Sequence, residues 1–241
     1  MELLDDVRHD RPRVHCITNT VAMNYTANIL LAVGAIPSMS IDPSEISDFV
    51  SSADALLINL GTLSTERKDS ITKAIETANN NHRPWVLDPV FVNRSPQRLK
   101  FAREIAKRRP VVIRANADEI RAMADHGTAT GEFAHKMNTV IGQTGQPDIV
   151  TDGNVETRIS NGHALMSRVT ALGCATSALT AAFTAVTNNT RAAAVSALLV
   201  IGIAGEIAVE FASGPGSLQT GILDALYNLN NDQITQRSRI E

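Results

Sequence analysis

Short apolar segments alternate with amphipathic segments along most of the chain. The clearest apolar segment, residues 55–60 (ALLINL), is almost unbroken, which is typical of a strand covered by helices on both faces. Further short strands are predicted at residues 13–17, 36–40, 85–87 and 111–113. Strands separated by helical segments predict an α/β fold in which helices cover both faces of a mostly parallel sheet.

The segments between these strands have helical periodicity. The first predicted helix runs to about residue 33, and the side chains of Thr18, Asn19 and Thr20 are candidate N-caps for it. Other helices are predicted to start at residue 43 and to span residues 64–80, 98–108 and 117–125. After a loose stretch at residues 127–131, strands are predicted at residues 139–142, 149–151 and 156–160, the last two joined by a turn at residues 152–154. Residues 173–229 are expected to be almost wholly helical, with breaks near residues 188–189 and 213–216.

Composition adds limits on partners and location. Of the 241 residues, 44% are hydrophobic and 4% aromatic, and the formal net charge is −3. Such a chain lacks the basic field and the aromatic platforms of nucleic-acid-binding proteins, so no nucleic acid partner is expected. Two distant cysteines, Cys16 and Cys174, indicate neither a disulfide framework nor a zinc site. Residues 1–13 are charged and lack the apolar run of a secretory signal, so we expect a cytoplasmic protein, and residues 1–241 contain no linker and read as a single domain.

One segment is long enough to span a membrane. Residues 192–212 are rich in Ala, Val, Ile and Leu, but they include Glu206 and Glu210. Carboxylates are costly inside a bilayer, whereas small residues favour close packing against another helix. We therefore expect a buried core helix and no membrane partner.

Parallel sheets bind ligands beyond the carboxyl ends of their strands, so residues at those ends are candidate site residues. They are Asn19, Met39, Asn59, Asp88, Arg114, Asn116, Glu119 and Thr144. Asn116 and Glu119 are three positions apart, which suits either a magnesium–water site or a helix cap. Arg114 suits either a phosphate clamp or a structural ion pair, and Asp88 either a ligand or a turn residue before Pro89.

The segment Thr170-Ala171-Leu172-Gly173-Cys174 leads into the apolar C-terminal region. A helix that begins there would point backbone N–H groups at an anion such as a phosphate group in transfer. Cys174 in the first turn would have a lowered thiol pKa and could act as a base, although a buried inert cysteine is the commoner case. The chain contains neither a GxxxxGK[ST] loop nor the protein-kinase motifs, which excludes those two phosphoryl-transfer classes.

Together these segments resemble the hydroxyethylthiazole kinases of the ribokinase-like superfamily. The resemblance rests on stretches that follow the family's order and cover most of the chain. They are residues 14–40 (VHCITNTVAMNYTANILLAVGAIPSMS), 56–64 (LLINLGTLS), 86–90 (VLDPV), 112–120 (VIRANADEI), 149–153 (IVTDG), 160–174 (SNGHALMSRVTALGC) and 214–227 (GPGSLQTGILDALY).

This resemblance implies a ribokinase-like three-layer α/β/α fold and a homotrimer with active sites between subunits. It also implies phosphorylation of the alcohol of 4-methyl-5-(2-hydroxyethyl)thiazole by ATP, with Mg²⁺ as cofactor. Carried over by position, Asn24, Met39 and Ala171 contact the thiazole, Arg114 and Thr144 contact ATP, and Asp88 and Glu119 serve the magnesium ion. Cys174 matches the residue that deprotonates the hydroxyl, where sugar kinases of the superfamily carry Asp.

Three departures from the family pattern leave other functions open. Ala171-Leu172 replaces Gly-Thr, Phe91–Ser95 replaces small residues, and the stretch at residues 124–134 is short. If the family's Gly provides a positive φ, Ala171 adopts a strained conformation there. The alternatives are a catalytically weak kinase-fold protein that binds thiazole or regulates, and a kinase for a related hydroxyalkyl heterocycle.

Overall fold

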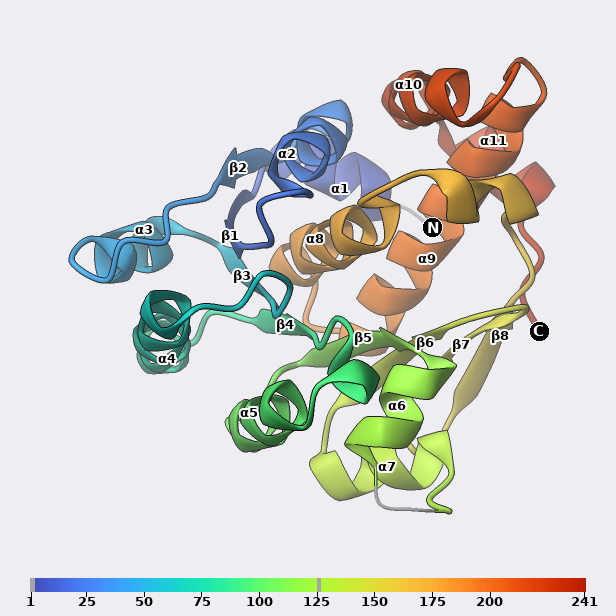
Figure 1. The fold of residues 1–241 in the computed structure, drawn as a ribbon. Helices are drawn as coiled ribbons and strands as arrows, with labels where there is room; N and C mark the ends of the chain where they lie inside the picture. Colours follow the sequence, from blue (N-terminus) through green and yellow to red (C-terminus); the bar gives the residue numbers. More distant parts are fainter. Residues whose placement is uncertain (1–2, 125–126) are drawn as a thin grey trace.

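The residues that the computed structural model describes, 3–124 and 127–241, form one eight-stranded sheet between two layers of helices (Figure 1). The order is β2-β1-β3-β4-β5-β6-β7-β8, with β1 to β6 parallel and β7 and β8 joining as antiparallel neighbours. The strands are β1 (Arg13–Ile17), β2 (Ile36–Ser38), β3 (Ala55–Asn59), β4 (Trp85–Asp88), β5 (Val112–Asn116), β6 (Val140–Thr144), β7 (Asp148–Thr151) and β8 (Glu156–Ile159). The predicted mostly parallel α/β fold is confirmed.

Each face of the sheet has its own hydrophobic core. One core packs against α1 (Leu3–Asp10), α2 (Met23–Ala32), α8 (Leu172–Ala185), α9 (Thr190–Val209), α10 (Pro215–Asn228) and α11 (Asn231–Arg237). The other packs against α3 (Ile46–Ser52), α4 (Thr65–Asn80), α5 (Pro96–Ala106), α6 (Ala117–Met123) and α7 (Thr130–Met137) (Figure 1). In β3, Leu57 points into the first core and Leu56 and Ile58 into the second, as the two-residue period of a strand requires.

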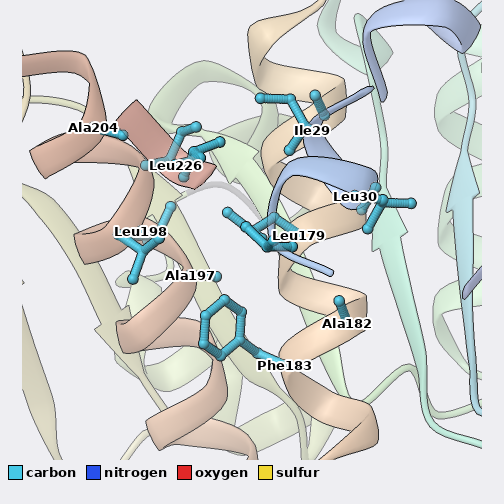
Figure 2. Packing of buried hydrophobic residues seen from close by; sticks show 14 of the residues in the cluster. Ile29, Leu30, Leu179, Ala182, Phe183, Ala197, Leu198, Ala204 and Leu226 are labelled. Atoms are coloured by element: carbon cyan, nitrogen blue, oxygen red, sulfur yellow. The ribbon is translucent and has the colours of Figure 1, made fainter. Parts of the chain in front are cut away.

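An extensive apolar contact lies between α8 and α9. Figure 2 shows Leu179 and Phe183 of α8 facing Ala197 and Leu198 of α9, with Ile29 of α2 close by. Alanines along both helices are fully buried, so the backbones approach closely. By length and composition α9 could cross a membrane, but 67% of its most apolar window is buried inside the protein, as in a core helix.

Several sequence predictions differ from the structure. The first core helix starts at Met23 rather than near Thr18, because the backbone at Asn19 forms a turn in which Ala22 N–H bonds to Asn19 Oδ1 at 3.0 Å. The helix α7 begins inside the stretch predicted to be loose, and α11 follows the last predicted helix. The predicted end of α6 at Asp125 and part of the short stretch 124–134 lie outside the described residues.

Candidate active site

Two strand ends place buried polar side chains under α8. Asn59 ends β3 and Asp88 ends β4, and both occupy positions that alternate toward the α8 face of the sheet. Asp88 Oδ2 accepts hydrogen bonds from Asn59 Nδ2 and from Ser177 Oγ of α8, each at 2.8 Å. The end of the sheet and the first turns of α8 are therefore joined through one carboxylate that is only 2% exposed.

Cys174 belongs to the same hydrogen-bonded cluster. Asn19 Nδ2 donates to Cys174 Sγ at 3.1 Å and to Asn59 Oδ1 at 3.1 Å. Gly61 makes room for this arrangement, since a Cβ atom there would lie 2.6 Å from Asn19 Cβ. Below we call Asn19, Asn59, Asp88, Cys174 and Ser177 the strand-end cluster.

The prediction that the Cys174 thiol has a lowered pKa is wrong. Burial raises its pKa to about 11, and the negative charge of Asp88 adds to that increase. Hydrogen bonds from Asn59 and Asn19 and the charge of Arg114 act in the opposite direction but are weaker. With such a pKa, roughly one Cys174 side chain in ten thousand is ionised at pH 7, so Cys174 is a neutral thiol.

Two buried carboxylates could serve a cation. Burial raises the pKa of Asp88 to about 6 against the opposing charge of Arg114, and the nearby charge of Glu119 also raises it. Glu119 Oε2 accepts the N–H of Asn116 at 3.0 Å and Oε1 accepts the N–H of Phe91 at 2.8 Å. Glu119 thus completes a capping box with Asn116, which was one of the two predicted alternatives, and also holds the loop after β4.

A hard cation fits the chemistry of this pair. Among the described residues Asp88 Oδ1 accepts no hydrogen bond, so one oxygen of an incompletely compensated carboxylate is available. No group of three or more His, Cys, Asp or Glu side chains in residues 3–124 and 127–241 could hold a metal ion by itself. Magnesium sites commonly use one or two carboxylates together with water and substrate phosphates, which is what this arrangement offers.

A cleft of about 1020 Å³ opens beside the strand-end cluster. Its walls comprise Arg114 of β5, the residues after β6, residues 159–167, and parts of α8 and α9. Arg114 and Thr144, the two predicted ATP contacts, both line it. Gly173 lies on its floor, and a Cβ atom there would approach Arg114 Nη1 to 3.1 Å, so the missing side chain lets the guanidinium reach the start of α8.

Arg114 connects the cleft with the strand-end cluster. It makes no hydrogen bond or ion pair to another described residue that would occupy its guanidinium, and its Nε is buried without a partner. Burial raises the pKa values of Asp88, Cys174 and Asp148, and the positive charge of Arg114 acts against each of these increases. Of the two predicted alternatives, the geometry favours a cation available to an anionic ligand over a structural ion pair.

A second cleft, of about 850 Å³, lies at the opposite end of the parallel strands, where they begin. Its lining includes Pro84 and Val111, which precede strands, and Ala185 at the end of α8. None of the predicted site residues lines it. The cleft beside Arg114 is therefore the better candidate for the reaction.

Ala171 has the strained conformation that its replacement of Gly suggested. It precedes α8 with φ 69° and ψ −4°, in the left-handed region that non-glycine residues rarely adopt. Leu172 packs into the core and lines the cleft. Unlike the Thr of the family pattern, its side chain has no hydroxyl to donate to a phosphate. Phe91, another departure from the family pattern, also has a positive φ (57°) and is 60% exposed.

Among the described residues, neither Asn24 nor Met39 forms a hydrogen bond to the strand-end cluster. Asn24 is exposed in the first turn of α2, and its side chain accepts a bond from Asn28. Met39 is partly buried just after β2, at the same edge of the sheet as Asn19 because β2 is parallel to β1. His15 fixes this region, since Nδ1 lies 2.8 Å from Ser38 Oγ and Nε2 lies 3.0 Å from Ser40 O.

Sequence reasoning located Asn19 and Asn59 at strand ends but assigned neither a part in the chemistry, naming Asn19 only a candidate helix N-cap, and it missed Ser177 and His15. A usable signal for Ser177 was its position three residues after Cys174, which places both on one face of a helix. His15 carried no such signal within an otherwise ordinary strand pattern.

Comparison with known proteins gives consistent matches. The sequence model described as the hydroxyethylthiazole kinase family matches residues 4–232. A probable hydroxyethylthiazole kinase of Agrobacterium fabrum is 42% identical over 240 residues, covering 100% of this chain and 94% of that protein. A hydroxyethylthiazole kinase of Cereibacter sphaeroides is 41% identical over 254 residues, covering 99% and 97%.

Solved structures agree with these matches. A hydroxyethylthiazole kinase protein from Pyrococcus horikoshii has a TM-score of 0.95 at 40% identity, covering 100% of this chain and 97% of that one. A ribokinase-like superfamily protein from Enterococcus faecalis has a TM-score of 0.69 at 12% identity, covering 91% and 88%. The second likeness concerns the fold alone, and it agrees with the predicted ribokinase-like architecture.

We expect alkylation of Cys174 by iodoacetamide to accelerate with pH without a plateau below pH 10, because its pKa is about 11. Asp88→Asn removes a charge that raises this pKa, so it should shift the profile to lower pH. Peptide mapping by mass spectrometry follows Cys174 separately from the fully buried Cys16. Asp118→Asn, which removes an exposed carboxylate, is the control of equal charge; a plateau below pH 9 in the unmodified protein would contradict the assignment.

Ala171→Gly should stabilise the fold by about 0.5–1 kcal/mol, because glycine relieves the left-handed conformation at the cost of a more flexible unfolded chain. The expected increase in Tm is about 1–4 °C. Urea and thermal unfolding measure both quantities. Ala182→Gly in the buried middle of α8 should be destabilising, and equal effects of the two substitutions would mean that Ala171 stores no strain.

Proposed function

The chain belongs to the hydroxyethylthiazole kinase family, and on this premise we propose that it transfers the γ-phosphoryl group of ATP to the alcohol of 4-methyl-5-(2-hydroxyethyl)thiazole for thiamine biosynthesis or salvage. The observation that supports this most is the position of Arg114. It lines the large cleft and acts electrostatically on both Asp88 and Cys174, so one cation serves the nucleotide side and the acceptor side. The cytoplasmic location expected from the N-terminal sequence is part of this proposal.

In this mechanism the triphosphate lies in the cleft, with Arg114 and Thr144 as contacts and the N–H groups at the start of α8 facing the transferred group. The alcohol oxygen bonds to the γ-phosphorus while the bond from that phosphorus to the bridging oxygen of ADP breaks. Phosphoryl transfer of this kind depends on positioning and charge stabilisation more than on a strong base. The strand-end cluster holds Cys174 in place for the alcohol through the bond from Asn19.

Cys174 receives the alcohol proton late in the transfer. Its pKa of about 11 means that it does not act as a ready-made base. Burial is the main cause of the raised pKa and the charge of Asp88 is the second, so offsetting that charge would let the thiol release its own proton to solvent more easily. The resulting thiolate accepts the alcohol proton as the new bond to phosphorus forms, which restores the neutral thiol.

Magnesium is the proposed cofactor, and when bound it would neutralise charge on the triphosphate. Asp88 would hold it with its available oxygen. Glu119 uses both oxygens for backbone N–H groups, so its contribution would be negative charge or a bond through water. Of the two predicted metal residues, Asp88 would therefore bind the ion directly and Glu119 would act by its charge or through water.

The decisive experiment measures ADP formation with Mg-ATP and the hydroxyethylthiazole. We expect turnover that chelation of the metal abolishes, and a decrease in kcat of about 10- to 100-fold for Cys174→Ser, at the low end of what a proton-transfer group contributes. Thiazole binding without turnover would favour the catalytically weak binding protein. Turnover only with another hydroxyalkyl heterocycle would favour the other alternative, and an unchanged Cys174→Ser rate would remove Cys174 as proton acceptor.

We also propose a homotrimer in which a neighbouring subunit completes the thiazole site. Val21, Leu31 and Ile36, on and beside α2 and the edge strand β2, are 67%, 57% and 41% exposed. Asn24 belongs to α2 and Met39 follows β2, so both lie in the same region. An apolar surface at an open sheet edge next to predicted substrate residues suits coverage by another copy of the chain.

Leu31→Asp should therefore lower the oligomeric mass and raise the KM for thiazole, because it places a charge in the proposed contact. Light scattering coupled to gel filtration measures the mass. Val155→Asp, at an exposed apolar residue after β7, is the matched control and should change neither quantity. A trimer that survives Leu31→Asp would place the contact elsewhere.

A further inference from the structure

The last residues of the chain add a short strand segment to the edge of the sheet. Ile240 forms an antiparallel bridge with Ile159 of β8. The backbones of Arg158 and Glu241 exchange two hydrogen bonds, at 2.8 and 2.9 Å, and Ser160 N–H donates to Arg239 O at 2.9 Å. Main-chain bonds thus hold residues 239–241 against the end of β8, and the segment that forms one wall of the Arg114 cleft follows directly after β8.

Arg239 also joins this edge to α9 through its side chain. Its Nη2 donates to Glu206 Oε1 and, at 3.0 Å, to Ser160 O, while its backbone N–H donates to Asn161 Oδ1 at 2.8 Å. Glu206 accepts further bonds from Asn161 Nδ2 at 3.2 Å and from Gly162 N–H at 2.6 Å. Glu206, one of the carboxylates that stood out in an apolar helix, therefore binds the tail and the cleft wall together.

Two glycines in α9 let the wall lie directly on the helix. A Cβ atom at Gly202 would come within 3.0 Å of the Asn161 backbone, and one at Gly205 would lie 2.2 Å from Met166 Sδ. Asn161, Gly162 and Met166 all line the cleft. The wall therefore packs directly on the glycine positions of α9, and the Glu206 carboxylate holds it there through hydrogen bonds.

We propose that Arg239 is a positioning residue for nucleotide binding, acting through a tail latch made of Arg239, Glu206 and Asn161. This inference rests on the proposed function, in which the cleft binds ATP. Arg239 is not among the residues that line the cleft, so it acts only by fixing residues 160–163. Loosening that wall would add an ordering cost to ATP binding and leave the strand-end cluster unchanged.

The kinetic signature is selective. Arg239→Ala should raise the KM for ATP by about 3- to 10-fold, with kcat changed less than about twofold and the KM for thiazole unchanged, since uniform binding is lost without loss of transition-state contacts. Arg237→Ala is a matched control. Arg237 pairs with Glu210, the residue directly after α9, at 2.8 Å, and contributes to the wall only its backbone oxygen, which accepts a bond from Asn161.

The test uses the full-length protein in steady-state assays, with Tm recorded for every variant. The inference is supported if Arg239→Ala raises the KM for ATP and Arg237→Ala does not, even when both lower Tm equally. It is overturned if the two variants share one KM for ATP. If Arg239→Ala does not fold, Glu206→Gln against Glu210→Gln decides by the same comparison, because Glu206→Gln removes the charge that binds Arg239. Absence of turnover in the unmodified protein would instead refute the proposed function.

Discussion

The structure of the site depends on the burial of Asp88. A carboxylate at the end of a central strand has lost most of its water, and two hydrogen bonds and the charge of Arg114 compensate only in part. The incomplete compensation has two effects. It leaves the carboxylate able to gain from a cation, and it adds to burial, the main cause, in raising the pKa of the Cys174 thiol. The buried charge of Asp88 thereby makes the pKa of the Cys174 thiol depend on any cation that binds beside it.

The fold was largely predictable because the relevant signals are local and repeated. The apolar strand of residues 55–59 and the turn between β7 and β8 follow from period and turn chemistry, and both are present. The helices α7 and α11 escaped prediction because they are short, with 8 and 7 residues or about two turns each. The start of α2 was misplaced because the Asn19 side chain serves a turn and the strand-end cluster rather than the helix end.

The site was predictable in outline but not in its electrostatics. The parallel strands β3, β4 and β5 bring Asn59, Asp88 and Arg114 together near their carboxyl ends, where sheets of this kind bind ligands. The sign of the Cys174 pKa shift could not be predicted, since it depends on how deeply the first turn of α8 is buried and on its proximity to Asp88. The left-handed conformation of Ala171 was foreseen from the replacement of Gly, whereas the roles of Asn24 and Met39 stay predictions, because neither side chain bonds to the strand-end cluster.

The alanine-rich contact between α8 and α9 has a consequence for how the molecule moves. Because small buried side chains leave no slack between these helices, α8 can neither slide nor tilt without opening a cavity or a clash. The end of α8 that carries Cys174 is therefore a fixed reference point in the molecule. The alcohol and the triphosphate must be brought to the thiol, because the thiol cannot move to them.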